Sequence, residues 1–585
     1  KVLSDEGREW GDVTIPYINK KQKIEKIMAR TILPDGSITL LDKSGIFEKE
    51  VFKTKGFKVK QKSFSLPAVS NDCIIEYHVK YRLPSSPSRW ITQKDIYLLN
   101  GELVWKFYRG RGLRGYQYSL ISDMVAPNYV MLNMNRTLKV EQRPSIKKPE
   151  EVVFIIENVA PFISEPHSMP GDALKSQVHY YYSSSETPEA FWGDMSSSMR
   201  ENLEVFTSKN KRVQKVVESF DELNEQKAKI KTAYHWLQEN IKNVSYEDDS
   251  DDYKDNNHLD DVLKRGYGSS SDINKAFYDM MREMNIDAKL VYVVDRSDNL
   301  FYQKAKYWQF DRSLVAIPDS RGRYKFYNPS AKYLTYDAVP WFNEGVQAFV
   351  VGASVNQFEN IPFSGSRKNT MLRFQELTMD KNLQISGKMS ERYKGHFGRS
   401  MRFALAESSE KDQIKYLEEG FAEDYANMEA DSFNVENLED ITKPIKVNCN
   451  IKVSTPLQTM GNLLILKPYD YFSDDADPFQ TTERKSPVLF DYASEVTETV
   501  KFNLSAGWRI ESLPADTVFT NDIGSCELYF RSYMDGKLLN VQRLFKIKKP
   551  LWDATYYKAV QKLFQSRQAF QDIAVVLKRD EEIKE

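Results

Sequence analysis

The stretch Lys264-Arg-Gly-Tyr-Gly-Ser-Ser-Ser-Asp-Ile-Asn-Lys-Ala-Phe-Tyr-Asp-Met-Met-Arg-Glu-Met-Asn-Ile-Asp-Ala288 decides the fold of the middle of the chain. It opens with two glycines and a polar turn, and apolar residues then recur at the spacing of one helical face. These apolar residues are Ile273, Ala276, Phe277, Met280, Met281 and Met284. The run Lys289-Leu-Val-Tyr-Val-Val294 follows and is rich in residues that favour strands. The pattern predicts a helix that begins after the glycine turn and leads into a strand.

This pattern resembles the transglutaminase-like superfamily, whose members place a catalytic cysteine at the start of this helix in a Gly-x-Cys-x-Asp-type motif. The matching residues are Gly268-Ser-Ser270-Ser-Asp272, so Ser270 stands at the cysteine position. The family's histidine begins a following strand, and Gln309-Phe-Asp-Arg312 places Arg312 there. The family's aspartate precedes a proline, and Tyr324-Lys-Phe-Tyr-Asn328-Pro places Asn328 there. The resemblance therefore implies a catalytic triad that is replaced at all three positions.

The loss of the triad does not depend on a fine alignment. No cysteine occurs between Cys73 and Cys449, and no histidine occurs between His258 and His396. A cysteine–histidine pair inside this region is excluded in any register. An arginine stays protonated and cannot act as a general base, and a serine hydroxyl needs such a base to become a nucleophile. We therefore expect an inactive core, in which Ser and Asp side chains between Ser269 and Asp272 cap the helix.

A serine enzyme of another design is the alternative. A Gly-x-Ser-x-Gly elbow would require a glycine two residues after Ser270, and Asp272 stands there instead. A Ser-x-x-Lys arrangement fails as well, because Lys275 lies four residues after Ser271, on what we expect to be the solvated face of the helix. A hydrolase, peptidase or acyl transferase that uses a non-standard site stays open as an alternative function.

The composition restricts the classes of partner. The chain of 585 residues has 82 basic and 83 acidic residues, so no overall charge favours nucleic acid. No apolar run approaches the roughly 20 residues that a transmembrane helix needs. Three widely separated cysteines exclude a disulfide framework and a Cys-x-x-Cys metal site, and we expect no cofactor and no metal. The acidic loop at residues 247–255 lacks the glycine and final glutamate of a calcium-binding EF-hand loop, so we expect a solvated loop there, with calcium binding as the alternative to test.

The order of patterns along the chain predicts a multidomain α+β protein. Residues 1–190 show alternating strands separated by turns, which predicts an N-terminal β-sandwich. Residues 191–350 carry the helical periods and the motif described above, and the resemblance of that motif implies a papain-like or transglutaminase-like α+β core. Residues 351–585 return to strands, with a helical stretch near 398–428 and a terminal helix near 552–577, which predicts a β-sandwich-like C-terminal domain ending in a helix. The same domain order occurs in bacterial transglutaminase-like proteins that the chain resembles, and these relatives are typically exported. We therefore expect a periplasmic or otherwise exported protein whose signal peptide has been removed.

The function that follows is binding rather than catalysis. We expect Ser270, Arg312 and Asn328 to line a polar cleft that takes a peptide, a glycan or a partner protein. The neighbours Ser269, Asp272 and Trp308 are expected beside them. Arg312 either holds a carboxylate of the ligand or pairs internally, for instance with Asp272 or Asp311. The many aromatic residues also leave open a polysaccharide-utilisation protein that binds glycan through exposed rings.

Overall fold

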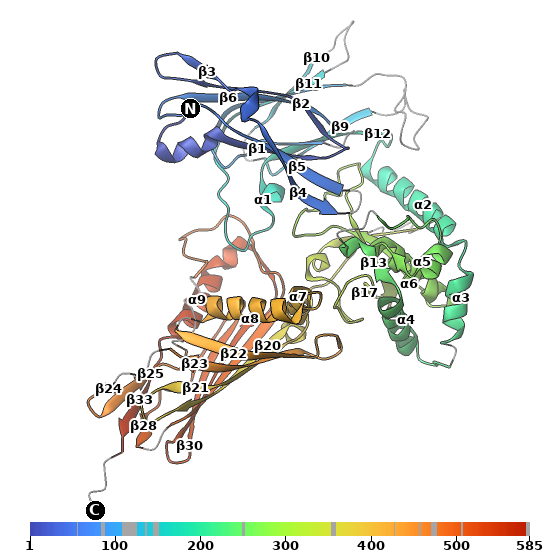
Figure 1. Cartoon of the computed structure of the whole chain (residues 1–585). Helices are drawn as coiled ribbons and strands as arrows, with labels where there is room; N and C mark the ends of the chain where they lie inside the picture. The colour runs from blue at the N-terminus through green and yellow to red at the C-terminus, as the bar shows by residue number, and fades with distance from the viewer. Residues whose placement is uncertain are drawn as a thin grey trace, which may run out of the picture.

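The protein is described by a computed structural model with three regions that follow one another along the chain (Figure 1). In Figure 1, the N-terminal β-region lies at the top, the central α+β region to the right and the C-terminal β-region at the bottom. The structure describes residues 1–580 apart from 55–56, 84–87, 108–125, 135–136, 144–150, 221, 248–251, 353–357, 426, 455–456, 458, 470–476 and 505–506. The expected α+β multidomain fold is confirmed.

The N-terminal region is built from small antiparallel sheets that pack in pairs. One pair consists of sheets β1-β5-β4 and β3-β2-β6, and a second pair consists of β10-β11-β8 and β7-β12-β9; each pair shares one hydrophobic cluster. Alternation decides which side chains face inward: along β1, Val13, Ile15 and Tyr17 are buried and the residues between them are exposed. The strands are β1 Asp12–Ile18, β2 Lys23–Ile32, β3 Ile38–Leu40, β4 Phe47–Thr54, β5 Phe57–Ser65, β6 Ile74–Arg82, β7 Ser88–Ile91, β8 Leu98–Lys106, β9 Ala126–Leu132, β10 Lys139–Arg143, β11 Glu151–Val159 and β12 Gln177–Ser183.

The central region places one buried helix, α6 (Ser270–Glu283), against a five-stranded sheet of order β17-β16-β15-β18-β19. The helix ends where Asn285 adopts a left-handed conformation, with φ of 57°. Its apolar stripe is buried among the surrounding helices, as the periodicity predicts. Those helices are α2 Pro188–Thr207, α3 Lys211–Glu218, α4 Gln226–Asn240 and α5 Leu259–Arg265.

The two faces of the central sheet are covered differently. Its strands are β15 Lys289–Val293, β16 Arg312–Pro318, β17 Tyr324–Tyr327, β18 Gln347–Val350 and β19 Phe358–Asn360. On β16, Val315 and Ile317 pack with α6, whereas Leu314 and Ala316 pack on the other face in an aromatic cluster centred on Trp192. Strand β19 continues this sheet past residue 350, the expected end of the core, and the expected domain boundaries stay predictions.

The C-terminal region is dominated by an eight-stranded sheet of order β22-β23-β21-β20-β27-β31-β30-β29. The expected helical stretch consists of two helices, α7 (His396–Leu405) and α8 (Glu410–Asp424), and the expected terminal helix is α9 (Tyr557–Ala569). One more strand, β33, follows α9 and joins a smaller sheet of order β24-β25-β33-β28. The strands are β20 Thr370–Met379, β21 Ile385–Tyr393, β22 Met428–Glu436, β23 Ile445–Val453, β24 Thr459–Met460, β25 Leu463–Leu466, β26 Val488–Leu489, β27 Ser494–Asn503, β28 Trp508–Ser512, β29 Thr517–Thr520, β30 Gly524–Tyr533, β31 Leu538–Ile547, β32 Leu551–Trp552 and β33 Val575–Arg579.

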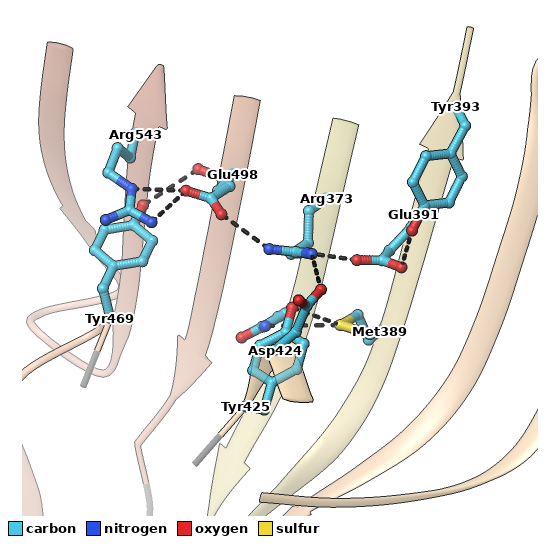
Figure 2. Close-up of polar contacts among 10 residues, drawn as sticks. Arg373, Met389, Glu391, Tyr393, Asp424, Tyr425, Tyr469, Glu498 and Arg543 are labelled. Carbon is cyan, nitrogen blue, oxygen red and sulfur yellow. Dashed lines mark hydrogen bonds and ion pairs between the residues drawn. The ribbon is translucent and has the colours of Figure 1, made fainter. Parts of the chain in front are cut away.

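A line of alternating buried charges crosses four neighbouring strands of the large sheet (Figure 2). Glu391 on β21, Arg373 on β20, Glu498 on β27 and Arg543 on β31 lie directly opposite one another in register. Arg373 Nη1 lies 3.0 Å from Glu498 Oε1, and Arg543 Nε lies 2.6 Å from Glu498 Oε2. Opposite charges on directly facing residues stabilise strand pairing, so this line also fixes the register of the sheet.

Helix α7 attaches the C-terminal region to the core. His396, Arg399, Phe403 and Glu407 recur at three- and four-residue spacing along α7 and just beyond its end, and all four contact the core. His396 Nε2 lies 3.2 Å from Glu344 Oε1, and both side chains are 2% exposed. Glu407 forms an ion pair with Lys332. Because these contacts lie on one side of α7, the helix packs against the core with that side.

Candidate polar site at the start of helix α6

Ser269 and Asp272 cap helix α6, as expected from the sequence. The Asp272 backbone N–H donates to Ser269 Oγ at 3.2 Å, and the Ser269 backbone N–H donates to Asp272 Oδ2 at 3.1 Å. This reciprocal capping box satisfies N–H groups that would otherwise lack partners at the helix start. Both side chains therefore form hydrogen bonds with backbone N–H groups. Ser270, the first residue of the helix, takes no part in this capping box.

The Ser270 side chain contacts the short strand β13 (Lys242–Asn243) that precedes the acidic loop. Asn243 Nδ2 donates to Ser270 Oγ at 3.0 Å, and the Ser270 backbone N–H donates to Ser245 Oγ at 2.9 Å. Ser270 is half-buried and Ser245 is exposed. The helix start therefore carries two serine hydroxyls close to the surface.

Asn328 belongs to the same polar network. Ser330 Oγ donates to Asn328 Oδ1 at 2.6 Å, and the Ser330 backbone carbonyl accepts from Asn243 Nδ2 at 2.7 Å. Asn274, one turn into α6 and fully buried, donates to Ser330 Oγ at 3.2 Å. Ser270 and Asn328 are thus joined through Asn243 and Ser330, although no direct hydrogen bond links the two among the described residues.

Arg312 interacts elsewhere. Its Nη2 lies 3.3 Å from Asp295 Oδ2 and its Nε lies 3.9 Å from Asp311 Oδ2, while the guanidinium carbon lies 5.5 Å from the Phe342 ring centroid. The next residue, Ser313, approaches α6, since Asn274 Nδ2 donates to its carbonyl at 2.6 Å. The described contacts of Arg312 are therefore internal and lie outside the network that contains Ser270 and Asn328.

Trp308 also lies outside this network. Its ring packs against Tyr292 at 5.0 Å and Phe310 at 5.2 Å between centroids, within the aromatic cluster on the opposite face of the sheet from α6. Lys275, which we expected on a solvated face, lies over the Phe206 ring at 4.5 Å, and that expectation was wrong. Burial lowers the pKa of Lys275. The apolar stem of a lysine readily packs in this way.

The edge of the site is shared with the C-terminal region. Phe403 of α7 packs against Tyr246 at 5.8 Å and Tyr333 at 5.1 Å between ring centroids. Arg399 Nε donates to the Lys332 carbonyl at 3.2 Å, and its guanidinium carbon lies 5.6 Å from the Phe342 ring centroid. Helix α7 therefore lies next to Tyr246, the residue that directly follows Ser245.

The comparison with protein families decides the identity of the central region. A sequence model of the transglutaminase-like superfamily matches residues 214–338. The central region therefore carries a transglutaminase-like core. Two domains of unknown function flank the match, DUF3857 at residues 1–162 and DUF3858 at residues 462–577. The expected resemblance and the three-part layout are confirmed.

One solved structure shares the overall fold of this chain. A crystal structure described as a "putative protease" from Parabacteroides distasonis aligns with 98% of this chain and 94% of its own, with a TM-score of 0.54 and 10% identity. A structure described as a "putative cysteine protease" from Cytophaga hutchinsonii covers 45% of this chain and 81% of its own at 10% identity, with a TM-score of 0.19. No curated protein matches the chain.

Among the described residues of the core, no hydrogen-bond partner of the Ser270 hydroxyl could take its proton. In the described part of the chain, the side-chain partner of the Ser270 hydroxyl is the Asn243 amide, which does not act as a base.

The described residues contain no cluster of three His, Cys, Asp or Glu side chains that could hold a metal ion. Residues 248–251 of the acidic loop lie outside the described residues, so the expectation of a solvated loop stays a prediction. None of the described helices is long and apolar enough to span a membrane.

The sequence reasoning missed the residues that hold the network together, namely Asn243, Asn274, Ser313 and Ser330. One signal was present: Asn274 is a polar residue directly beside the apolar stripe of α6, four positions after Ser270. A buried amide at that place must find hydrogen-bond partners. Asn243 and Ser330 gave no comparable signal, because they come from other segments.

Proposed function

We propose that this chain is a non-catalytic transglutaminase-like protein that binds a peptide segment of a partner at the start of helix α6. The observation that carries this proposal is the contact between the Ser270 hydroxyl and the Asn243 amide. An amide cannot accept the hydroxyl proton, so Ser270 lacks the activation that serine nucleophiles need. Assignment of Ser270, Arg312 and Asn328 to the former catalytic positions is part of the proposal.

The geometry supports a binding role in two ways. The capping box keeps the helix start intact, and the hydroxyls of Ser245 and Ser270 lie there within reach of a ligand. Helix α7 supplies the aromatic ring of Phe403 beside Tyr246, which gives an apolar surface next to those hydroxyls. A short peptide has both carbonyl groups for the hydroxyls and side chains for the rings.

Turnover assays separate this proposal from the hydrolase that the protease-like structural neighbour suggests. Peptide, ester and amine-donor substrates are incubated with the wild-type protein and with Ser270→Ala. We expect both proteins to give the background rate. Turnover that disappears in Ser270→Ala would establish the hydrolase or acyl transferase alternative and refute the non-catalytic proposal.

Binding is tested with a panel of fluorescein-labelled peptides and, in parallel, with a panel of soluble glycans. Ser245→Trp fills the space in front of the helix start, and Ser219→Trp, at an exposed serine at the end of α3, is the matched control. We expect a peptide that binds the wild type to bind Ser245→Trp at least tenfold more weakly and Ser219→Trp unchanged. Equal binding to all three proteins, or binding of glycans alone, would contradict the proposed site.

The proposal includes an exported location in the bacterial envelope, which rests on the domain order of the relatives that the chain resembles. Fractionation of cells that make the full-length protein tests it. We expect the protein in the envelope fractions, and recovery with cytoplasmic markers would contradict this part of the proposal.

A further inference from the structure

A cavity of about 230 Å³ lies where the three regions of the chain meet. Met169 reaches it from the N-terminal region, and Leu489 and Leu551 reach it from strands β26 and β32 of the C-terminal region. The rest of the wall comes from the segments 294–302 and 345–347 and from Phe363. None of the residues in the Ser270 network lines it. The cavity is therefore separate from the site proposed above.

The wall of the cavity is mainly apolar. Leu300, Phe301, Val346 and Phe363 line it together with the leucines of the C-terminal region. Gly345 has φ of 73°, and a Cβ atom there would lie 2.0 Å from the Phe363 ring. A glycine at this position therefore lets the Phe363 ring lie directly against the backbone. Such a surface suits the apolar part of a ligand, and ligand sites are frequent at domain interfaces.

Arg296 is the charged residue in the wall, and it is 4% exposed. Its Nε donates to the Trp341 carbonyl at 3.1 Å and its Nη2 donates to the Asp491 carbonyl. The guanidinium also lies 5.1 Å from the Trp341 ring centroid and 5.5 Å from that of Phe363. Its Nη1 makes no hydrogen bond with the described residues, and because Arg296 lines the cavity we infer that this N–H group is the one left to donate to a ligand.

Three carboxylates lie close enough to Arg296 to act on its charge. Burial lowers the pKa of Arg296, and the carboxylates of Asp491, Glu344 and Asp295 oppose this effect. A further anion in the cavity would meet three carboxylates as well as the guanidinium. A neutral acceptor such as an amide carbonyl takes the free N–H without this repulsion.

We propose that the cavity binds a small neutral ligand, in which an apolar group packs against Leu300, Phe301 and Leu551 and a carbonyl oxygen accepts a hydrogen bond from Arg296 Nη1. An apolar cavity of about 150 Å³ accepts a benzene molecule, so this one is large enough for a single aromatic or aliphatic group with its adjoining amide. The ligand contacts all three regions at once. Its binding would therefore stabilise their arrangement.

The test uses the full chain and the neutral probe N-acetyl-phenylalaninamide, observed by saturation-transfer difference NMR at millimolar concentration. Leu551→Trp fills the cavity, and Leu463→Trp, at a partly exposed leucine on β25, is the control. We expect the wild type and Leu463→Trp to bind the probe and Leu551→Trp to lose at least four-fifths of the signal. If Leu551→Trp fails to fold, Gln347→Trp blocks the cavity from its exposed rim instead.

Two further probes complete the experiment. N-acetyl-phenylalanine carries a carboxylate in place of the amide, and we expect it to bind several-fold more weakly. A capped Gly-Gly-Phe-Gly-Gly peptide distinguishes the sources of the ligand: binding at least as tight as that of the free amide indicates a peptide residue, and weaker binding indicates a small molecule. The proposal is overturned if the wild type does not bind the neutral amide, if binding survives in the filled cavity, or if the carboxylate binds more tightly.

Discussion

The hydroxyl oxygen of Ser270 lies 3.0 Å from the side-chain amide nitrogen of Asn243, at the first position of a 14-residue helix. A helix start lowers the pKa of a thiol placed there, but it cannot ionise a hydroxyl without a base. The core thus retains the backbone geometry that suits a thiolate and, among the described contacts of Ser270, lacks a proton acceptor. A cysteine in place of Ser270 tests the effect of the helix start separately from the effect of the missing base.

Ser270→Cys is expected to create a reactive thiol without creating an enzyme. The three native cysteines are buried, and burial raises the pKa of Cys449 and of Cys526 to about 12, so the wild type should resist iodoacetamide. We expect the new thiol to titrate below the usual pKa of about 8.5, because it sits at the helix start. The measurement is the pH dependence of the labelling rate, with substrate turnover assayed in parallel.

Ser219→Cys is the control for this experiment, because exposed Ser219 follows the C-terminal end of α3, where the helix dipole has the opposite sign. Its thiol should titrate at a higher pH than that of Ser270→Cys. A midpoint for Ser270→Cys equal to or above that of the control, or substrate turnover by Ser270→Cys, would contradict the argument.

Asn274→Leu should destabilise the core by about 1–3 kcal/mol, because the buried carbonyl of Ser313 loses the hydrogen bond from Asn274 Nδ2. Leucine is close in volume, so little of this change comes from a cavity. Urea unfolding followed by hydrogen exchange of α6 peptides measures the loss. Asn240→Leu on the exposed end of α4 is the control and should change stability by under about 0.5 kcal/mol. Equal effects of the two substitutions would show that the network contributes nothing.

The sequence predicted helix α6 and its start because the signals are local. The apolar stripe and the Ser269–Asp272 capping box lie within one segment, and the family resemblance carried the layout of the three regions. The helical stretch near 398–428 was predicted as one element, but the structure breaks it before Glu410, where Ser409 caps the second helix.

The site was predicted less completely because its geometry depends on distant segments. Arg312 and Ser313 are adjacent at the start of β16, and adjacent strand residues point to opposite faces. Which side chain approaches α6 depends on how the strand docks, and the structure gives that contact to Ser313, whose Oγ lies 3.5 Å from Asn274 Nδ2. Asn243, Asn274 and Ser330 come from three segments of the chain and meet only in the folded core.

Glu498→Gln should cost about 3 kcal/mol, because its carboxylate lies between Arg373 and Arg543 and is 3% exposed (Figure 2). Hydrogen exchange of β27 peptides measures the loss. The matched control is Glu376→Gln. Glu376 Oε1 on β20 lies 2.6 Å from Lys501 Nζ on β27, and both side chains are near the surface. That substitution should cost at most about 1 kcal/mol.

Acid should remove the difference between the wild type and Glu498→Gln. Burial raises the pKa of Glu498, but the guanidiniums of Arg543 and Arg373 outweigh burial and keep it below the usual value. A carboxylate with a lowered pKa stabilises the fold above its unfolded pKa, near 4.3, and loses this contribution as pH falls through the folded value. A difference in stability that stays constant from pH 7 to pH 3 would contradict this account.

His179 should make the contact between the N-terminal region and the core sensitive to pH. Its Nδ1 lies 2.6 Å from the hydroxyl of Tyr307 in the core, and its Nε2 lies 2.8 Å from Gln177 Oε1. A neutral imidazole satisfies both contacts, since Nε2–H donates to Gln177 while Nδ1 accepts from Tyr307. Burial, with a smaller effect from Arg89, lowers the pKa of His179 to about 4.

Because the unfolded histidine titrates near 6.5, the unfolded state binds more protons than the folded state between about pH 4 and pH 6.5, and stability falls as pH falls through this range. We expect a loss of about 2 kcal/mol between pH 7 and pH 5 at this contact, measured by hydrogen exchange of peptides that cover β12 and residues 302–307. His179→Gln should remove this loss, whereas His78→Gln, at an exposed histidine on β6, should leave it unchanged. A wild-type contact equally stable at pH 7 and pH 5 would show that His179 is not held neutral by its burial.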